Sequence, residues 1–225
     1  MFYLPALHSQ SQEFQLSQDE SAHCIRVLRK QAGDKIEILN GLGLWFEAQI
    51  QIPNPKKCSG IILRVHQEVQ SPLVHLVVAP TKNMDRMEWL VEKGTELGCT
   101  RFSFISTKRT ERSKINLERL QKIAIAAMKQ SKRWHLPQID QLLPMETFLR
   151  LNEQGWVAHC HEDLDRTHIE GDLPPRVMIG PEGDFTKEEL QAVFKAGYRP
   201  ITLGNARLRT ETAALKAIML LEARG

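Results

Sequence analysis

From Leu73 to the end of the chain, short apolar runs alternate with segments of helical periodicity, and this alternation limits the fold more than any other feature. The run 73–80 (LVHLVVAP) is continuously apolar, as in a strand buried on both faces. Further strands are predicted at 101–106, 156–160, 176–179 and 200–203, and helices at 85–97, 116–128, 186–196 and 211–223. Such alternation is typical of a mostly parallel sheet covered by helices. We therefore predict an α/β domain over 72–225.

The first 71 residues are richer in β and turn signals. Ser17 and Glu20 form a capping-box pattern before a short helix of about ten residues. Strands are predicted at 35–39, 44–52 and 61–69, separated by an Asn-Gly-Leu-Gly turn and by prolines. We expect a small β-rich module over 1–71, which ends at Ser71-Pro72.

Composition argues against several classes of protein. The N-terminus lacks a basic segment followed by an apolar one, and no run approaches the ~20 apolar residues that cross a membrane, so we expect a cytoplasmic protein with no membrane contact. The four cysteines lie far apart and form no Cys-x-x-Cys pair, which favours reduced thiols. His159, Cys160 and His161 alternate in direction on a strand, so no metal site is predicted. His161 is expected to line a pocket at the strand end.

The net charge of +3 is unevenly distributed. Between Arg101 and His135, ten Lys or Arg residues stand against two Glu, which gives 10 − 2 = +8 in that window and 3 − 8 = −5 elsewhere. Charge runs are more often solvated surfaces, but an excess of this size, with Trp134 able to stack on a base, favours RNA binding. The residues expected to contact RNA are Arg109, Arg112, Lys132 and Arg133 in the window, and Arg26 and Arg29 in the N-terminal module.

Two glycine-containing loops follow neighbouring predicted strands. Gly180-Pro-Glu-Gly183 comes after 176–179, and 203–212 (LGNARLRTET) comes after 200–203. Open α/β sheets bind ligands at the carboxyl ends of their strands, and glycine lets the backbone approach a ligand closely. We expect one pocket formed by both loops. The alternative is that the first loop only shapes a turn, with Glu182 in solvent.

Acidic residues in the first loop decide between ligands. Glu182 and Asp184 would repel a triphosphate, and the chain has no Gly-Lys-Ser/Thr sequence to bind phosphates. A dinucleotide fold would place a glycine-rich turn after its first strand, where this chain has Ala79-Pro-Thr-Lys82. S-adenosylmethionine carries a sulfonium, an ammonium and ribose hydroxyls, which tolerate carboxylates, so it is the predicted cofactor.

Together these motifs resemble a known family. Ile179-Gly-Pro-Glu-Gly183, Leu203-Gly204 and Leu208-Arg-Thr-Glu-Thr-Ala213 are similar to the C-terminal signature of the 16S ribosomal RNA (uracil-N3) methyltransferases, the RsmE family of the SPOUT class. The likeness covers nearly the whole chain. Its other parts are His23-x3-Val27-Leu28-Arg29, Gly33-Asp34, Glu92-Lys93, Glu96-Leu97-Gly98 and Gln130-Ser131-x-Arg133.

The resemblance implies a PUA-like RNA-binding β-barrel over 1–71 and, over 72–225, a SPOUT-type trefoil-knotted α/β methyltransferase domain that forms a homodimer. The implied activity is methylation of N3 of a uridine in 16S ribosomal RNA or the small ribosomal subunit. The implied cofactor residues are Ile179, Gly180, Pro181, Glu182, Gly183, Leu203, Gly204, Asn205 and Leu208, with His161 beside them. Asp184 replaces a usual glycine, which Asp tolerates better than most residues. Ala206-Arg207 replaces an Arg followed by an aliphatic residue, and Arg207 is placed with the RNA contacts.

Methylation of uracil N3 requires loss of the imide proton and alignment of the nitrogen for in-line displacement at the sulfonium. We assign Arg209 to stabilise the anion that develops on uracil, and Glu211 to accept the N3 proton. The alternative is a purely structural role, because Thr210 is a natural N-cap and Glu211 would complement the helix dipole. Two other functions stay open: a SPOUT methyltransferase acting on another RNA position, and a non-catalytic RNA-binding assembly factor.

Overall fold

The structure is a computed structural model that describes residues 1–69, 72–112, 114–151, 154–169 and 171–224. The chain divides into two compact units. Unit 1 contains Met1–Gln70 and Ile125–Leu136, and unit 2 contains Ser71–Ala124 and Pro137–Gly225. The boundary predicted at Ser71 falls outside the described residues.

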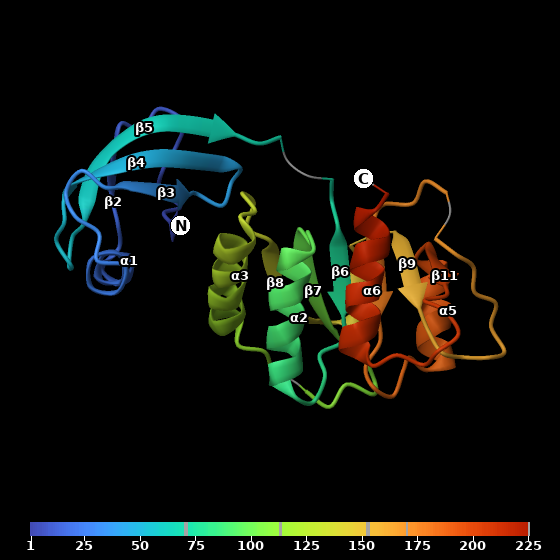
Figure 1. Cartoon of the computed structure of the whole chain (residues 1–225). Coiled ribbons are helices and arrows are strands. Elements are labelled where there is room, and N and C mark those ends of the chain that lie inside the picture. Colours follow the sequence, from blue (N-terminus) through green and yellow to red (C-terminus); the bar gives the residue numbers. More distant parts are fainter. Residues whose placement is uncertain (70–71, 113, 152–153, 170, 225) are drawn as a thin grey trace. The chain divides into compact units, whose positions relative to one another are not determined.

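Unit 1 is built on a five-stranded sheet in the order β1-β3-β4-β5-β2 (Figure 1). The strands are β1 (Phe2–Tyr3), β2 (Glu13–Gln15), β3 (Lys35–Leu39), β4 (Leu44–Ile52) and β5 (Ser59–Gln67). Neighbours are antiparallel except β1, which runs parallel to β3. Alternate side chains such as Ile36, Phe46 and Ile50 form the core. The three longer strands confirm the prediction, whereas β1 and β2 are too short to show a period.

The predicted ten-residue helix has the expected length but not a uniform geometry. Helix α1 (Gln18–Ala22) continues as the π-helix η1 (His23–Val27). The Ser17 hydroxyl caps α1 by accepting the Glu20 N–H (3.3 Å). The Glu20 carboxylate instead accepts from Lys129 Nζ (2.6 Å) and the Tyr3 N–H (3.2 Å). Only half of the predicted capping box therefore forms, because the ammonium of Lys129 provides a stronger partner for Glu20.

Unit 2 contains a six-stranded parallel sheet in the order β11-β9-β10-β6-β7-β8, which confirms the predicted α/β class. Its strands are β6 (His75–Val78), β7 (Arg101–Ser106), β8 (Gln138–Pro144), β9 (Gly155–Ala158), β10 (Arg176–Ile179) and β11 (Tyr198–Ile201). Strands β6 and β10 are buried throughout, as their apolar runs predict. The sequence did not predict β8, an edge strand of mixed polarity that is only half-buried.

Helices cover both faces of this sheet. They are α2 (Met84–Glu96), α3 (Leu117–Ser131), α4 (Met145–Leu149), α5 (Lys187–Lys195) and α6 (Thr210–Glu222), and α3 contributes to both units. Figure 1 shows α2 and α6 side by side across one face. They meet closely because Gly94 lacks a side chain: a Cβ there would lie 3.2 Å from Ile218 Cδ1 on α6 and 2.8 Å from the Phe102 ring on β7. On the other face, α4 and α5 share a core with the sheet, and Thr186 and Glu189 form the predicted capping box at α5.

A buried polar network joins four strands of unit 2 near their amino ends. Arg176 Nε donates to His75 Nδ1 (2.7 Å), and His75 Nε2 donates to Ser103 Oγ (2.7 Å). Ser103 Oγ and Arg101 Nε both donate to Asp140 Oδ2 (2.5 and 2.7 Å). Burial and then the charges of Arg176 and Arg101 lower the pKa of His75 to about 3, so the ring is neutral in the folded protein. Protonation of His75 at low pH therefore favours the unfolded chain.

This network predicts a pH dependence of stability. The pKa of His75 is about 3 in the folded protein and 6.5 in the unfolded chain, so protonation of this ring does not affect stability above pH 6.5 and lowers stability below it. The free energy of unfolding should fall by roughly 1.4 kcal/mol per pH unit from this group as pH decreases from 6.5 toward 3. Urea unfolding between about pH 7 and about pH 5 should show a shallower slope for His75→Gln than for wild type. The exposed His8 is the control, and His8→Gln should keep the wild-type slope.

Candidate functional site

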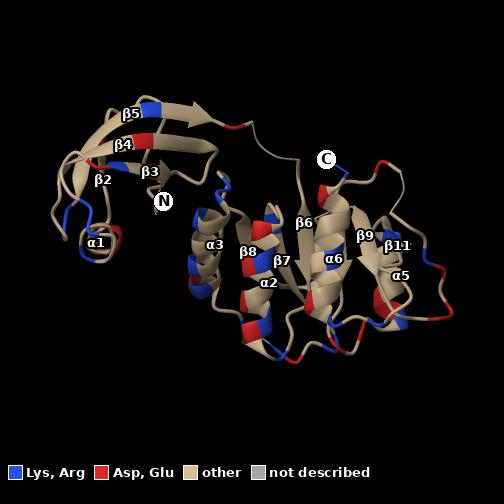
Figure 2. Cartoon of the chain, in the orientation of Figure 1, with Lys and Arg blue, Asp and Glu red and all other residues tan. Residues whose placement is uncertain are grey.

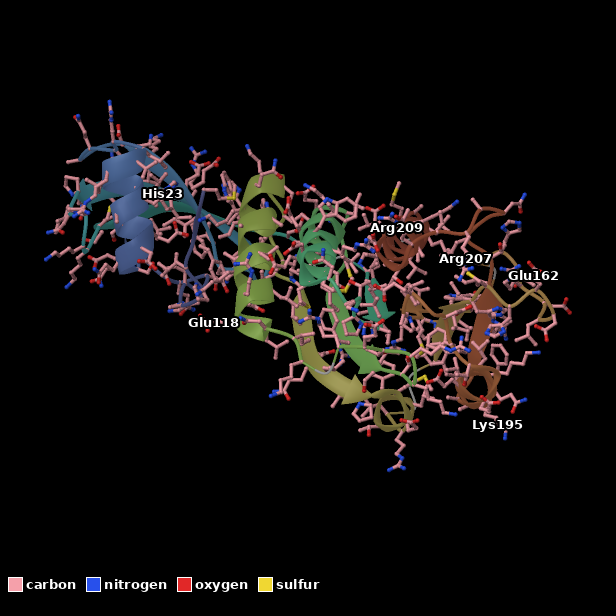
Figure 3. All side chains as sticks on the ribbon, turned by 90° about the horizontal axis from the view of Figure 1, so that it is seen from below. His23, Glu118, Glu162, Lys195, Arg207 and Arg209 are labelled. Atoms are coloured by element: carbon pink, nitrogen blue, oxygen red, sulfur yellow. The ribbon has the colours of Figure 1, made fainter. Side chains whose placement is uncertain are left out.

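A cavity of about 350 Å³ opens at the carboxyl ends of β9, β10 and β11. Both predicted loops contribute to its walls, so the structure brings them together. The predicted cofactor residues that line it are Ile179, Gly180, Pro181, Glu182, Leu203, Gly204 and Leu208. Arg207 and Arg209 line it as well, and Figure 3 shows both on the segment that leads into α6.

Asp184 fastens the first loop to the neighbouring strand. Its φ is +62°, and its N–H donates to the carbonyl of Pro181 (2.9 Å), which closes the turn. The carboxylate accepts the N–H of Cys160 through Oδ2 (2.7 Å) and of Phe185 through Oδ1 (2.8 Å). Asp184 thus adopts the left-handed backbone expected of it, and it links the end of β9 to the loop after β10, which glycine could not do.

Glu182 is turned toward the loop that follows β6. Its Oε1 accepts the backbone N–H of Lys82 (3.2 Å). The carbonyl of Lys82 in turn accepts from Arg112 through Nε (3.1 Å) and Nη2 (2.6 Å). On the other side of the first loop, Arg109 Nη1 donates to the carbonyl of Gly183 (2.5 Å). Two arginines predicted as RNA contacts therefore hold the backbone around the cavity.

The second wall depends on Gly204 and on the start of α6. Gly204 has φ +104°, a conformation strained for any other residue, and its N–H donates to Thr202 Oγ1 (3.1 Å). Arg209 occupies the N-cap position of α6 with no side-chain cap hydrogen bond. The expectation that Thr210 is the N-cap was wrong. Thr210 is the first helical residue, and its buried hydroxyl donates to the carbonyl of Gly180 (3.2 Å) and so joins the two walls.

Glu211 does not face this cavity. Only 7 % of it is exposed, and its Oε1 lies 3.7 Å from Arg86 Nε on α2. Its Oε2 is buried without a hydrogen-bond partner among the described residues. The predicted proton acceptor is therefore directed at α2 rather than at the pocket.

Three other predicted cofactor residues stand outside the cavity wall. Gly183 carries the carbonyl bound by Arg109, and a Cβ on it would lie 3.1 Å from Arg109 Cδ. Asn205 is exposed in the second loop. The ring of His161 is turned to the backbone, where Nε2 donates to the carbonyl of Phe185 (2.7 Å).

Sequence reasoning placed the end of β9 at a pocket through His161 alone, and missed the residues there that line the cavity. Ala158, His159, Cys160 and Arg166 line the cavity. His159 is buried, burial lowers its pKa, and neither ring nitrogen has a hydrogen-bond partner among the described residues. Arg166 Nη1 donates to the carbonyl of His159 (3.0 Å). No glycine or periodic pattern marks this segment, and only its place after a predicted strand could have identified it.

The basic window is less basic on the folded surface than in the sequence. It is divided between the two units, and Figure 2 shows acidic residues interspersed with its Lys and Arg. Among the described residues, five of its ten cations are seen within 4.0 Å of a carboxylate. These pairs are Arg101 with Asp140, Lys108 with Glu188, Arg119 with Glu88, Lys122 with Glu118, and Lys129 with Glu20.

The remaining predicted RNA contacts belong to unit 1. Arg26 and Arg29 are exposed at the end of the π-helix, Lys132 is exposed after α3, and Arg133 is half-buried. Trp134 is half-buried and stacks on Trp45, with ring centroids 5.9 Å apart, so one of its faces is already occupied.

Two observations concern sites of other kinds. In the described parts of the chain, no three His, Cys, Asp or Glu side chains gather so that they could hold a metal ion. None of the described helices combines the length and the apolar character needed to cross a membrane.

Comparisons with known proteins agree with this architecture. Residues 69–222 match a family described as RNA methyltransferase domain, and residues 16–63 match one described as RNA methyltransferase PUA domain. The chain is 30% identical to the ribosomal RNA small subunit methyltransferase E of Buchnera aphidicola, over 93% of this chain and 88% of that protein.

Solved structures resemble both units. A probable rRNA-methyltransferase from Porphyromonas gingivalis is 35% identical, with a TM-score of 0.87 over 99% of this chain and 96% of that chain. A ribosomal RNA small subunit methyltransferase E from Neisseria gonorrhoeae, bound to S-adenosyl methionine, is 26% identical, with a TM-score of 0.84 over the same shares of the two chains.

The bond between the two walls can be tested by stability. Thr210→Val keeps the side-chain shape but leaves the Gly180 carbonyl without its hydroxyl donor, so we expect a loss of about 1–2 kcal/mol in the free energy of unfolding. Thr210→Ser retains the hydroxyl and should lose less. Urea unfolding of the three proteins measures this, and equal stability of Thr210→Val and wild type would show that the bond contributes nothing.

Proposed function

This chain belongs to the ribosomal RNA small subunit methyltransferase E family, and from that premise we propose that it transfers a methyl group from S-adenosylmethionine to N3 of a uridine in 16S ribosomal RNA. The single observation that carries the proposal is the cavity formed by the loops after β9, β10 and β11. A protein that only binds RNA has no use for such a cavity beside strand ends.

The residues of the cavity are suited to S-adenosylmethionine. Ile179, Leu203 and Leu208 offer apolar surface for an adenine ring, and the glycines expose backbone donors and acceptors. Glu182 and Asp184 supply negative charge compatible with a sulfonium and an ammonium. When bound, the cofactor supplies the electrophilic methyl group.

Arg209 is the residue we assign to the uracil. It lines the cavity, forms no ion pair among the described residues, and precedes the N-terminus of α6, whose dipole adds positive potential. A guanidinium held there stabilises negative charge that develops on uracil as the N3 proton leaves. Glu211 faces Arg86 on α2, so in this proposal it does not take the proton of uracil N3. That proton passes to solvent.

The proposed assembly is a homodimer with a trefoil knot at the site, active in the cytoplasm on 16S ribosomal RNA or the small subunit. After β11 at the sheet edge, the chain returns to α6, which packs on β10 and β6, and this return supports a knotted segment. Exposed apolar side chains on the two adjacent helices support a dimer face: Trp89 on α2 is 44% exposed, and Met219 and Leu220 on α6 are 55% and 39% exposed. The cations of unit 1, including Arg26, Arg29 and Lys132, are proposed to contact RNA.

Cofactor binding provides a first test. Because Gly204 adopts a positive φ in the cavity wall, Gly204→Ala should displace the second loop and weaken S-adenosylmethionine binding by at least about tenfold in calorimetry. Gly33 also has a positive φ but lies in unit 1 with open space around it, so Gly33→Ala is the matched control and should bind normally. A folded wild-type protein that binds no S-adenosylmethionine would refute the proposal.

The RNA product provides the second test. Ribosomal RNA from a strain lacking this gene should lose one uridine methyl group by mass spectrometry, and the wild-type gene should restore it. Arg209→Ala should fail to restore it while keeping cofactor affinity within about threefold, since the residue acts on the uracil. Arg150, exposed at the end of α4, provides the control variant Arg150→Ala. Loss of a methyl group from another base or from a ribose would assign the enzyme to another RNA position.

A further inference from the structure

The acidic and the basic side chains around the cavity differ in whether they have partners. Glu182 and Asp184 accept hydrogen bonds from backbone N–H groups. Arg166, Arg207 and Arg209 also line the cavity, and none of the three has a carboxylate within ion-pair distance among the described residues. Unpaired cations at a ligand cavity favour a ligand with an anionic group.

Arg166 is the guanidinium that the fold holds in place. Its Nη1 donates to the carbonyl of His159, at the end of β9. The next residue, Thr167, forms a parallel bridge with Ile201, and its carbonyl accepts the N–H of Thr202 (2.8 Å). Arg166 is thus held between the ends of β9 and β11, and its other N–H donors have no partner among the described residues.

The other two arginines have no comparable anchor. All three arginines are exposed, but Arg207 in the second loop and Arg209 at the N-cap of α6 form no side-chain hydrogen bond with the described residues. A guanidinium already held in position loses less conformational entropy when it binds an anion. Arg166 is therefore the best placed of the three to bind a fixed anionic group of a ligand.

We propose that Arg166 binds the carboxylate of the methionine moiety of S-adenosylmethionine, and so sets the position of the cofactor in the cavity. This inference rests on the proposed function. The carboxylate is the one anionic group of that cofactor, whose sulfonium and ammonium are cations better placed near Glu182 and Asp184. Arg166 is a positioning residue, because it holds the cofactor and does not touch the reacting nitrogen.

The test compares two ligands that differ in the amino acid moiety. S-adenosylhomocysteine carries the carboxylate, whereas 5′-methylthioadenosine ends at the thioether. For Arg166→Gln, calorimetry should show an affinity for S-adenosylhomocysteine lowered about 10- to 100-fold. The affinity for methylthioadenosine, measured by displacement of S-adenosylhomocysteine, should stay within about twofold of wild type. Removing a cation cannot weaken the binding of the ligand's ammonium, so a selective loss reports the carboxylate.

Two variants and a stability measurement complete the experiment. Arg166→Lys keeps the charge but loses the planar guanidinium that can donate two parallel hydrogen bonds. Its affinity for S-adenosylhomocysteine should lie between those of wild type and Arg166→Gln. Arg207→Gln removes an unanchored cation from the same cavity, and should leave the ratio of the two affinities unchanged. Thermal unfolding without ligand checks that each variant folds as the wild type does.

Each other outcome contradicts the proposal in a recognisable way. An equal loss for both ligands would make Arg166 a structural residue of the wall, and no loss for either would remove it from the cofactor site. A selective loss in Arg207→Gln instead would assign the carboxylate to Arg207. If the wild-type protein binds neither ligand, the proposed function itself fails, which is distinct from failure of the role of Arg166.

Discussion

The cavity exists because side chains tie together backbone segments that come from separate strands. Thr210 bonds to the carbonyl of Gly180, and Asp184 bonds to the N–H of Cys160. A third bond, from His161 Nε2 to the carbonyl of Phe185, also joins the segment after β9 to the loop after β10. Because the three segments are already held in position, less conformational entropy is lost when a ligand that contacts all of them binds.

Much of the fold could be predicted because its signals are local. The buried strands β6 and β10 are apolar apart from their first residues, His75 and Arg176. The caps of α3 and α5 are sequence patterns that the structure reproduces: Asn116 accepts the Arg119 N–H, and Thr186 pairs with Glu189. The π-helix, the edge strand β8 and the N-cap at Arg209 were not predicted. They depend on contacts with residues distant in sequence, which no short window contains.

The site was predicted less completely than the fold, for a related reason. Gly180 and Gly204 could be found because glycine in a loop after a strand has a local meaning. Arg166 could not, since its position depends on a bond to the carbonyl of His159 and on the pairing of Thr167 with β11, which no local pattern marks. Charge counting was misleading in the same way: Lys129 belongs to the basic window, but the fold brings it to Glu20, 109 residues away.

Helix α3 enters both units, and this affects how the protein can be divided. Residues 125–136 belong with the N-terminal sheet, where Trp134 stacks on Trp45 and the Gly43 N–H donates to the carbonyl of Trp134 (3.0 Å). A fragment that ends at residue 69 would leave Trp45 without Trp134 and Glu20 without Lys129. The N-terminal sheet is therefore not complete without the second half of α3, and grafting it elsewhere would require carrying that half with it.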